Sequence, residues 1–403
     1  MQRRTQRIGG IVALAGAGVL ALGTVGIVRR NRAADQRWGA ALAVADDLHA
    51  QREAEPSERP VLWGAGNDED AWPHYRRALA LVERWDASEV AAALRDGDAQ
   101  ARVALLARGG EALDLLARGA HATHAARRVD PARGFAHESL GLLHTRALTQ
   151  LGELRATQLF EEGRQDEAVR ALLDVLQLGG DLARGPLLIE EMIGVAVLSP
   201  DVLVDGVADG SLLALEAGAQ ARLAEGVATL SDGLSWRSSA RETELVLFAH
   251  GLDRAFAGAC GVPDDWLERA GGGARTRELA AAHVHATLDL HADLDRAFGG
   301  GPCALLARIE RLPTQAEAAP NPFARLTWPA LASSARARAF SLARFRLLAY
   351  ALSGGDPPTD PWLSEWLRAD EEEGRTRLWL DHGLFEGVEV FVGRPDPAGT
   401  SAR

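Results

Sequence analysis

The sequence predicts an all-α protein in which antiparallel helical hairpins, stacked as repeats or as an irregular α-solenoid, follow one N-terminal transmembrane helix. Three observations predict this class. The 21 residues of Ile8–Val28 carry no charge. From residue 70 to residue 352, apolar side chains recur at the spacing of amphipathic helices. Strand-like runs are absent until Thr376–Leu380 and Val388–Val392, which predict a small C-terminal β-hairpin.

The apolar run Ile8–Val28 predicts a membrane anchor. As a helix it would reach about 31 Å, close to the thickness of a bilayer's hydrocarbon core. A cleavable signal peptide is the alternative, because Ala21-Leu22-Gly23 resembles a cleavage site. The run continues past that site and ends at Arg29-Arg30, which favours a retained anchor.

Small residues form one face of the anchor at every fourth position, at Gly9, Ala13, Ala17 and Ala21. Such a face predicts a homodimer through the transmembrane helix, and a simple tether is the alternative. Arginines flank both ends of the anchor, so the positive-inside rule nearly cancels. Because long domains translocate largely regardless of charge, we expect a single-pass protein whose main domain lies outside the cytoplasm.

The polar stretch Glu53–Asp70 is the longest linker that the sequence indicates. We therefore divide the chain into an anchor (1–32), a membrane-proximal helix with its linker (33–69), a helical body (70–352) and a tail with the β-hairpin (353–403). Within the body, glycines stand where helices should end and prolines where new ones begin. These include Gly163, Gly185, Gly210 and Gly233 as stops and Pro302 as a start.

One internal repeat supports a body built of similar units. Leu252–Phe256 (LDRAF) recurs as Leu294–Phe298, an offset of 42 residues. Helical repeats commonly have periods of about 34–47 residues. In a chain rich in alanine and arginine, a chance match of five residues is the alternative.

The segment Leu159–Leu178 resembles the hairpin turn and second helix of a tetratricopeptide repeat. The resemblance is carried by Gly163 in the turn and by Ala168 and Leu172 on the helix that follows. The proline that usually closes such a unit is replaced by Gly179-Gly180. The resemblance implies the packing style of these repeats and not a true tandem array.

The overall layout resembles that of uncharacterised, N-terminally anchored helical proteins of planctomycete-type bacteria. The residues that carry this resemblance are Ala71-Trp72, Tyr75–Ala78, Gly163 to Ala168, and Leu378-Trp379 with Gly383. It implies an anchored helical protein of a bacterial cell membrane, and it implies no activity. Leu384–Gly387 departs from the tail pattern of that group.

Composition excludes several chemistries. All 44 basic residues are arginine, so a phosphate-binding loop, a protein kinase and a pyridoxal enzyme, each of which needs a lysine, are excluded. The net charge of −12 argues against a nucleic-acid partner. Cys260 and Cys303 match no zinc or redox spacing; they read as buried thiols or as a single disulfide. We expect no cofactor.

A cluster of histidine and aspartate on the predicted helix 274–298 is the candidate metal site. His285, Asp289 and Asp293 are spaced four residues apart, which places them on one helix face. Imidazole and carboxylate groups can bind a divalent metal ion. One helix rarely supplies a whole site, so a solvated face is the alternative.

Two adjacent carboxylates, Glu190 and Glu191, lie inside an unusually apolar helix. Burial would raise a carboxyl pKa and suit a general acid. The alternative is an ion pair with an arginine of another helix. Because neighbouring residues point about 100° apart on a helix, we expect at least one of the two to face water.

The segment 318–355 contains no acidic residue but several arginines and aromatics. It predicts a docking face for an acidic partner or for anionic lipid headgroups, with the candidates Arg336, Arg338, Arg344, Arg346 and Trp328. The alternative is that these arginines pair with the protein's own acidic helices.

Two function classes follow. The first is a membrane-tethered helical-repeat scaffold that binds other proteins and catalyses nothing. The second is a metal-dependent hydrolase that uses the histidine and aspartate cluster on helix 274–298.

Overall fold

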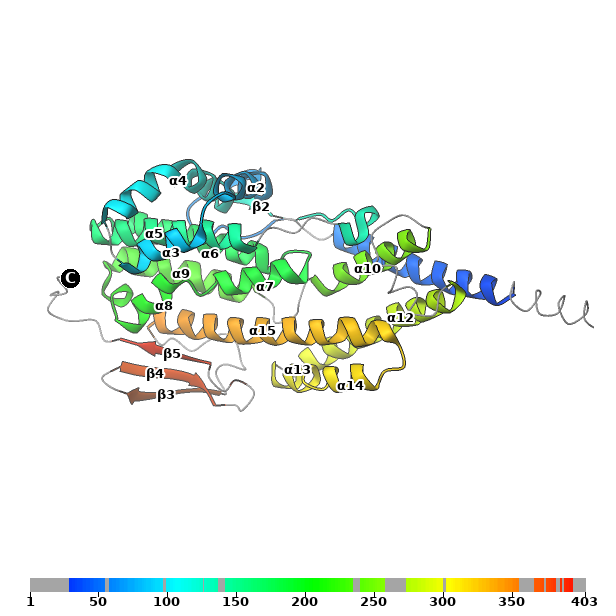
Figure 1. The fold of residues 1–403 in the computed structure, drawn as a ribbon. Helices are drawn as coiled ribbons and strands as arrows, with labels where there is room; N and C mark the ends of the chain where they lie inside the picture. Colours follow the sequence, from blue (N-terminus) through cyan, green and yellow to red (C-terminus); the bar gives the residue numbers. More distant parts are fainter. Residues whose placement is uncertain are drawn as a thin grey trace, which may run out of the picture.

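The computed structural model is mostly α-helical and ends in a small antiparallel sheet (Figure 1), so the predicted fold class is confirmed in its helical part. The structure describes residues 29–54, 58–96, 99–125, 127–136, 142–234, 240–257, 273–299, 302–354, 366–372, 375–381, 385 and 388–393.

The predicted anchor Ile8–Val28 and its small-residue face lie outside the described residues. Within the described ranges, no helix is both long enough and apolar enough to cross a bilayer. Residues 29–53 form one continuous helix, whose first turns project from the right-hand end of the molecule in Figure 1.

The upper layer in Figure 1 holds α2 (Ala71–Val82) and α4 (Ala99–Ala120), and α3 (Ala87–Asp96) lies below them beside α5. Helix α2 begins where the side chain of Asp70 accepts a hydrogen bond from the backbone N–H of Trp72 at 3.1 Å. This is a regular N-cap, which supplies one of the acceptors that a helix start lacks. The apolar face of α2 buries Trp72, Tyr75 and Leu79 against α4 and α5.

The hairpin of α5 (Leu142–Glu161) and α6 (Gln165–Ala183) confirms the predicted helical hairpin. Gly163 makes the turn at a φ of +74°, a conformation that glycine adopts without the steric cost of a Cβ atom. Helix α6 is central to the fold, and every residue from Leu172 to Ala183 is buried.

A 31-residue helix, α15 (Pro322–Leu352), runs along most of the molecule beneath the middle layer (Figure 1). At 1.5 Å per residue it is about 46 Å long. It packs against α7 (Leu188–Val197), α8 (Asp201–Ala208) and α9 (Ala217–Gly233), with which it shares the largest apolar core. The short helices α13 (Pro302–Ile309) and α14 (Leu312–Ala318) lie on its other side.

The predicted membrane-proximal helix packs on the body. With α10 (Ala240–Phe256) and α12 (Gly273–Gly299) it forms a separate apolar cluster. The indole N–H of Trp38 donates to Asp253 at 2.9 Å, and Trp38 is buried. Both copies of the LDRAF repeat close a helix, the first α10 and the second α12. Cys260 and the side chain of Cys303 lie outside the described residues.

The linker before α2 is also held to the body. The guanidinium of Arg59 forms a buried ion pair with Asp181 at 2.8 Å and donates to the carbonyl oxygen of Gly119 at 2.8 Å. The hydroxyl of Tyr75 donates to Asp181 at 2.8 Å. Burial raises the pKa of the Asp181 carboxyl, and Arg59 opposes that shift. The buried ion pair with Asp181 thus holds the linker, at Arg59, against helix α6.

The C-terminal sheet has the strand order β3-β4-β5, with β3 at Leu367–Glu372, β4 at Arg375–Leu380 and β5 at Glu389–Val392. The predicted hairpin corresponds to β4 and β5, which pair antiparallel with Leu378 opposite Val390. Strand β3 was not predicted. Two further short strands, β1 (Asn67–Asp70) and β2 (Ala122–His124), pair in parallel, and short 3-10 turns lie at Pro131–Ala136 (η1) and Leu212–Ala214 (η2).

Candidate functional site

A pocket of about 600 Å³ lies where α7, α10, α12 and α15 meet, and we call it the α7–α15 pocket. Its volume is typical of small-molecule sites and of pockets that take a partner's side chain. Most of the lining is apolar. The lining residues are Gly134, Leu187, Leu188, Ile189, Arg241, Glu244, Leu245, Leu247, Phe248, His283, Thr287, Leu326, Thr327, Ala330 and Leu331.

His283 is one of the buried polar residues that line this pocket, with 1% of its surface exposed. Its Nε2 lies 3.2 Å from the hydroxyl oxygen of Thr327 and 3.4 Å from that of Thr287. The hydroxyl of Thr327 donates to the carbonyl oxygen of Phe323 at 3.1 Å. The hydroxyl of Thr287 accepts from the indole N–H of Trp328 and keeps its own proton, so Nε2 of His283 can accept from Thr287 or donate to Thr327.

Nδ1 is the second ring nitrogen of His283. The atom is buried and has no hydrogen-bond partner among the described residues. The ring packs edge-on against Phe248 at 5.0 Å between ring centroids. Burial, with a smaller contribution from His291, lowers the pKa of His283 to about 4. The imidazole is therefore neutral at neutral pH.

The charged groups of the pocket already have partners. Glu244 accepts a hydrogen bond from the backbone N–H of Leu188 at 2.9 Å, and burial raises the pKa of its carboxyl. Arg241 pairs with Asp295 and with Glu242. The pocket is thus a mostly apolar space, and the buried Nδ1 of His283 has no hydrogen-bond partner among the described residues.

Helix α7, at the edge of the pocket, inverts the usual distribution of side chains. Glu190 and Glu191 are both fully buried, whereas Ile189 and Met192 are 42% and 38% exposed. The expectation that one of the carboxylates faces water is wrong. The alternative of arginine partners is confirmed, because Arg127 pairs with Glu190, and Glu191 has a partner in α15.

The candidate metal ligands lie away from this pocket. His285 and Asp289 are exposed on α12, and Asp293 pairs with Arg308 and, at 3.4 Å, with Arg296. The described residues contain no group of three or more His, Cys, Asp or Glu side chains that could hold a metal ion.

The five docking candidates of α15 do not form one face. Arg338 is buried, with an ion pair to Glu191 at 3.1 Å, and Arg346 is 9% exposed and donates to the carbonyl oxygen of Leu234. Trp328 is half-buried and donates to Thr287 in the α7–α15 pocket. Of the set, Arg336 and Arg344 are exposed. The alternative of pairing with the protein's own groups therefore describes Arg338 and Arg346.

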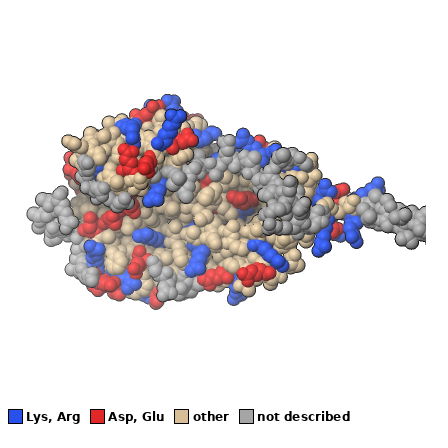
Figure 2. Space-filling model, in the orientation of Figure 1, with Lys and Arg blue, Asp and Glu red and all other residues tan. Residues whose placement is uncertain are grey.

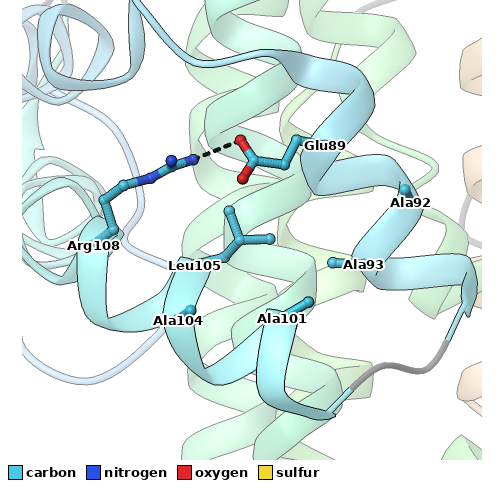
Figure 3. Close-up of a pocket in the computed structure, with 7 residues that line it drawn as sticks. All are labelled: Glu89, Ala92, Ala93, Ala101, Ala104, Leu105 and Arg108. Carbon is cyan, nitrogen blue, oxygen red and sulfur yellow. Dashed lines mark hydrogen bonds and ion pairs between the residues drawn. The ribbon is translucent and has the colours of Figure 1, made fainter.

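A second hollow, of about 380 Å³, lies between α3 and α4 (Figure 3). Its walls are small side chains, with Ala93 and Ala101 among them, and an ion pair between Arg108 and Glu89 at 2.9 Å spans it. Arg108 also stacks on the ring of Trp85. Its charged groups have partners, so this hollow offers less to a ligand than the α7–α15 pocket.

Acidic and basic side chains are interspersed over the face of the molecule in Figure 2.

Comparisons of this chain with protein-family models, with curated proteins and with solved structures find no significant match.

Sequence reasoning considered the histidines of α12 but missed the residues that surround His283. Thr287 lies one helical turn after it, while Thr327 and Leu326 come from α15, some 40 residues away. One signal of this site was present in the sequence. The apolar residues Leu187 to Ile189 stand directly before two carboxylates. The two carboxylates of this run are buried with arginine partners, and Ile189 is exposed.

Proposed function

We propose that this chain is a membrane-tethered helical scaffold that binds another protein through the α7–α15 pocket and its rim, without catalysing a reaction. The anchor Ile8–Val28 would hold it at a bacterial cell membrane, with the body outside the cytoplasm. The support for binding is the surface of α7, where Ile189 and Met192 are exposed while Glu190 and Glu191 are buried.

Three exposed apolar residues support this proposal. Ile189 and Leu326 both line the α7–α15 pocket, and they are 42% and 50% exposed. Met192 lies one turn after Ile189, on the same side of α7. Single exposed apolar residues are common on any protein, but a group of them around a concave apolar site is typical of an interface.

Site-specific photo-crosslinking in cells tests the proposal. A photoreactive amino acid at Ile189 or at Leu326 should give an adduct with the same partner protein. Val103, which is 57% exposed on α4, is the matched control and should not give that adduct. A second change, Met192→Glu, should abolish the adduct at Leu326 because it places a charge on the apolar rim. Equal adducts at all three positions, or none, would contradict the proposal.

The alternative, a metal-dependent hydrolase, finds no support in the geometry of its candidate residues. Asp293 is engaged by two arginines, which hold the pKa of its carboxyl below the usual range. We therefore do not propose it.

A further inference from the structure

We propose that one end of the body rests on the membrane and binds the anionic headgroups of phospholipids. Residues 29–37 and 273–279 form this surface, and we call it the membrane-facing end. The first turns of helix 29–53 project from it (Figure 1). The proposal rests on the anchor of the proposed function, and it adds the surface of the body that meets the lipid.

Only a short stretch of helix separates the apolar run from the body. The described helix starts directly after Val28, the last residue of that run, and it packs on the body from Ala34, which has none of its surface exposed. One turn later, Trp38 is held by its hydrogen bond to Asp253. At 1.5 Å per residue, the helix rises about 9 Å between Val28 and Ala34. Each headgroup layer of a bilayer is about 5–7 Å thick, so the body begins where the headgroups end.

Two ion pairs place the start of α12 beside the same part of this helix. Arg277 pairs with Asp35 at 3.1 Å, and Arg37 pairs with Glu278 at 3.3 Å. Both helices start towards the right-hand end of the molecule in Figure 1, so the first turn of α12 faces the same side as the anchor. Asp35 lies about 10 Å of helix beyond the apolar run. The exposed side chain of Arg275, in the first turn of α12, is therefore within reach of lipid phosphates.

The charge of the membrane-facing end is opposite to that of the whole protein. The end contains six arginines and two acidic residues, a net charge of +4, whereas the chain has a net charge of −12. Both acidic residues, Asp35 and Glu278, already pair with arginines. The exposed arginines of this end that have no ion pair within the described ranges are Arg29, Arg30, Arg32 and Arg275.

These arginines fit phospholipid headgroups. A guanidinium binds a phosphate group with two parallel hydrogen bonds, and each basic residue near an anionic membrane adds to the attraction. Figure 2 shows basic side chains on the helix that projects from this end. The rest of the chain carries the excess of acidic residues, which the same headgroups repel. The membrane-facing end is therefore the surface that can contact an anionic bilayer.

Fluorescence quenching by labelled lipids tests the proposal on the full-length protein in phosphatidylcholine vesicles. A fluorescent amino acid replaces Ala274, next to Arg275, and in a control protein it replaces the exposed Val103 on α4, towards the left of Figure 1. The vesicles contain a small fraction of either spin-labelled phosphatidylglycerol or spin-labelled phosphatidylcholine. At position 274, we expect the anionic lipid to quench at least fivefold more strongly than the zwitterionic lipid. Neither lipid should quench at position 103.

Two matched substitutions assign the preference to the body. Arg275→Gln removes one positive charge from the start of α12, so it should lower the preference for the anionic lipid by up to about fivefold, the effect of one arginine near a charged surface. Arg344→Gln removes an exposed arginine of α15 and should leave the preference unchanged. Circular dichroism melts establish that both variants are folded.

The outcomes separate this inference from the proposed function. Equal quenching by both lipids at position 274 would overturn the inference and leave the anchor in place. A preference that Arg275→Gln does not change would overturn the contact between α12 and the lipid. Absence of quenching by either lipid would show that the chain is not in the bilayer, and it would overturn the membrane tether as well. The crosslinks from Ile189 and Leu326 decide separately whether the pocket rim contacts a partner protein.

Discussion

The carboxyl group of Glu153 should make the stability of this protein depend on pH. Glu153 lies on α5 with 6% of its surface exposed, and it accepts a hydrogen bond from the backbone N–H of Val202 at the start of α8. Burial raises the pKa of this carboxyl to about 7, and the charge of Asp201 adds to the shift. The usual value for glutamate is 4.5.

The sign follows from the direction of the shift. The folded protein holds the proton of Glu153 more tightly than the unfolded chain, so the group favours folding most below pH 4.5. That contribution is lost as pH rises towards 7. At about 1.4 kcal/mol per pKa unit, a shift of this size corresponds to a loss of roughly 3 kcal/mol in the free energy of unfolding.

The variant Glu153→Gln removes the titration and keeps an oxygen that can accept from Val202. It should match the unmodified protein near pH 4.5 and exceed its free energy of unfolding by up to about 3 kcal/mol at pH 8. Urea denaturation at both pH values measures the difference. Glu225→Gln, at an exposed position of α9, is the control and should show no such change. A difference between variant and parent that stays constant with pH would refute the reasoning.

Two further changes test the packing of α7 and α15. Arg338→Ala leaves the buried carboxylate of Glu191 without this ion pair, and it should lower the free energy of unfolding by about 3–5 kcal/mol in urea denaturation. The control Arg344→Ala, at an exposed position, should change that free energy by less than about 0.5 kcal/mol. In Gly194→Ala, the added Cβ would lie 2.1 Å from the backbone nitrogen of Ala183, so we expect a loss of about 1–3 kcal/mol. Gly110→Ala, with open space around it, should instead gain about 0.5–1 kcal/mol in the same assay.

The helical part of this fold could be predicted because its signals are local. Periodic apolar residues and the glycine at position 163 predict the α5–α6 hairpin, and the structure contains it. The β4–β5 pair was predicted for the same reason, from short runs of β-branched and aromatic residues. Strand β3, with the sequence LRADEE, has no such signal. It is held by its pairing with β4, so its conformation depends on a neighbour and not on its own residues.

The candidate site was predicted less well, because a sequence shows which residues share a helix face but not which face turns inward. On α12, His283 and His291 are buried, while His285 and Asp289 are exposed. The choice between these faces is made by α10 and α15, which pack against α12. The same holds for Glu191, whose partner Arg338 is 147 positions away and whose burial was therefore not expected.

The starts of four consecutive helices show why local rules fail in this region. The residues before α7, α8 and α9 make no side-chain cap to their own helix. Instead, a side chain from another helix accepts from a backbone N–H at each start. The accepting side chain is Glu244 for α7, Glu153 for α8, Gln165 for α9 and Glu191 for α10.

These contacts take the place of the serine, threonine, aspartate or asparagine that a local N-cap would use. They also link the position of each helix to that of its neighbour, because the cap forms only when the two are packed. Glu191 and Glu244 belong to this set and also flank the α7–α15 pocket, Glu244 as one of its lining residues. Of the two carboxylates considered for acid catalysis, Glu191 thus accepts a hydrogen bond at the start of α10, and Glu190 pairs with Arg127. On α7, the burial of Glu190 and Glu191 accompanies the exposure of Ile189 and Met192, while Ile193 and Val195 face the core.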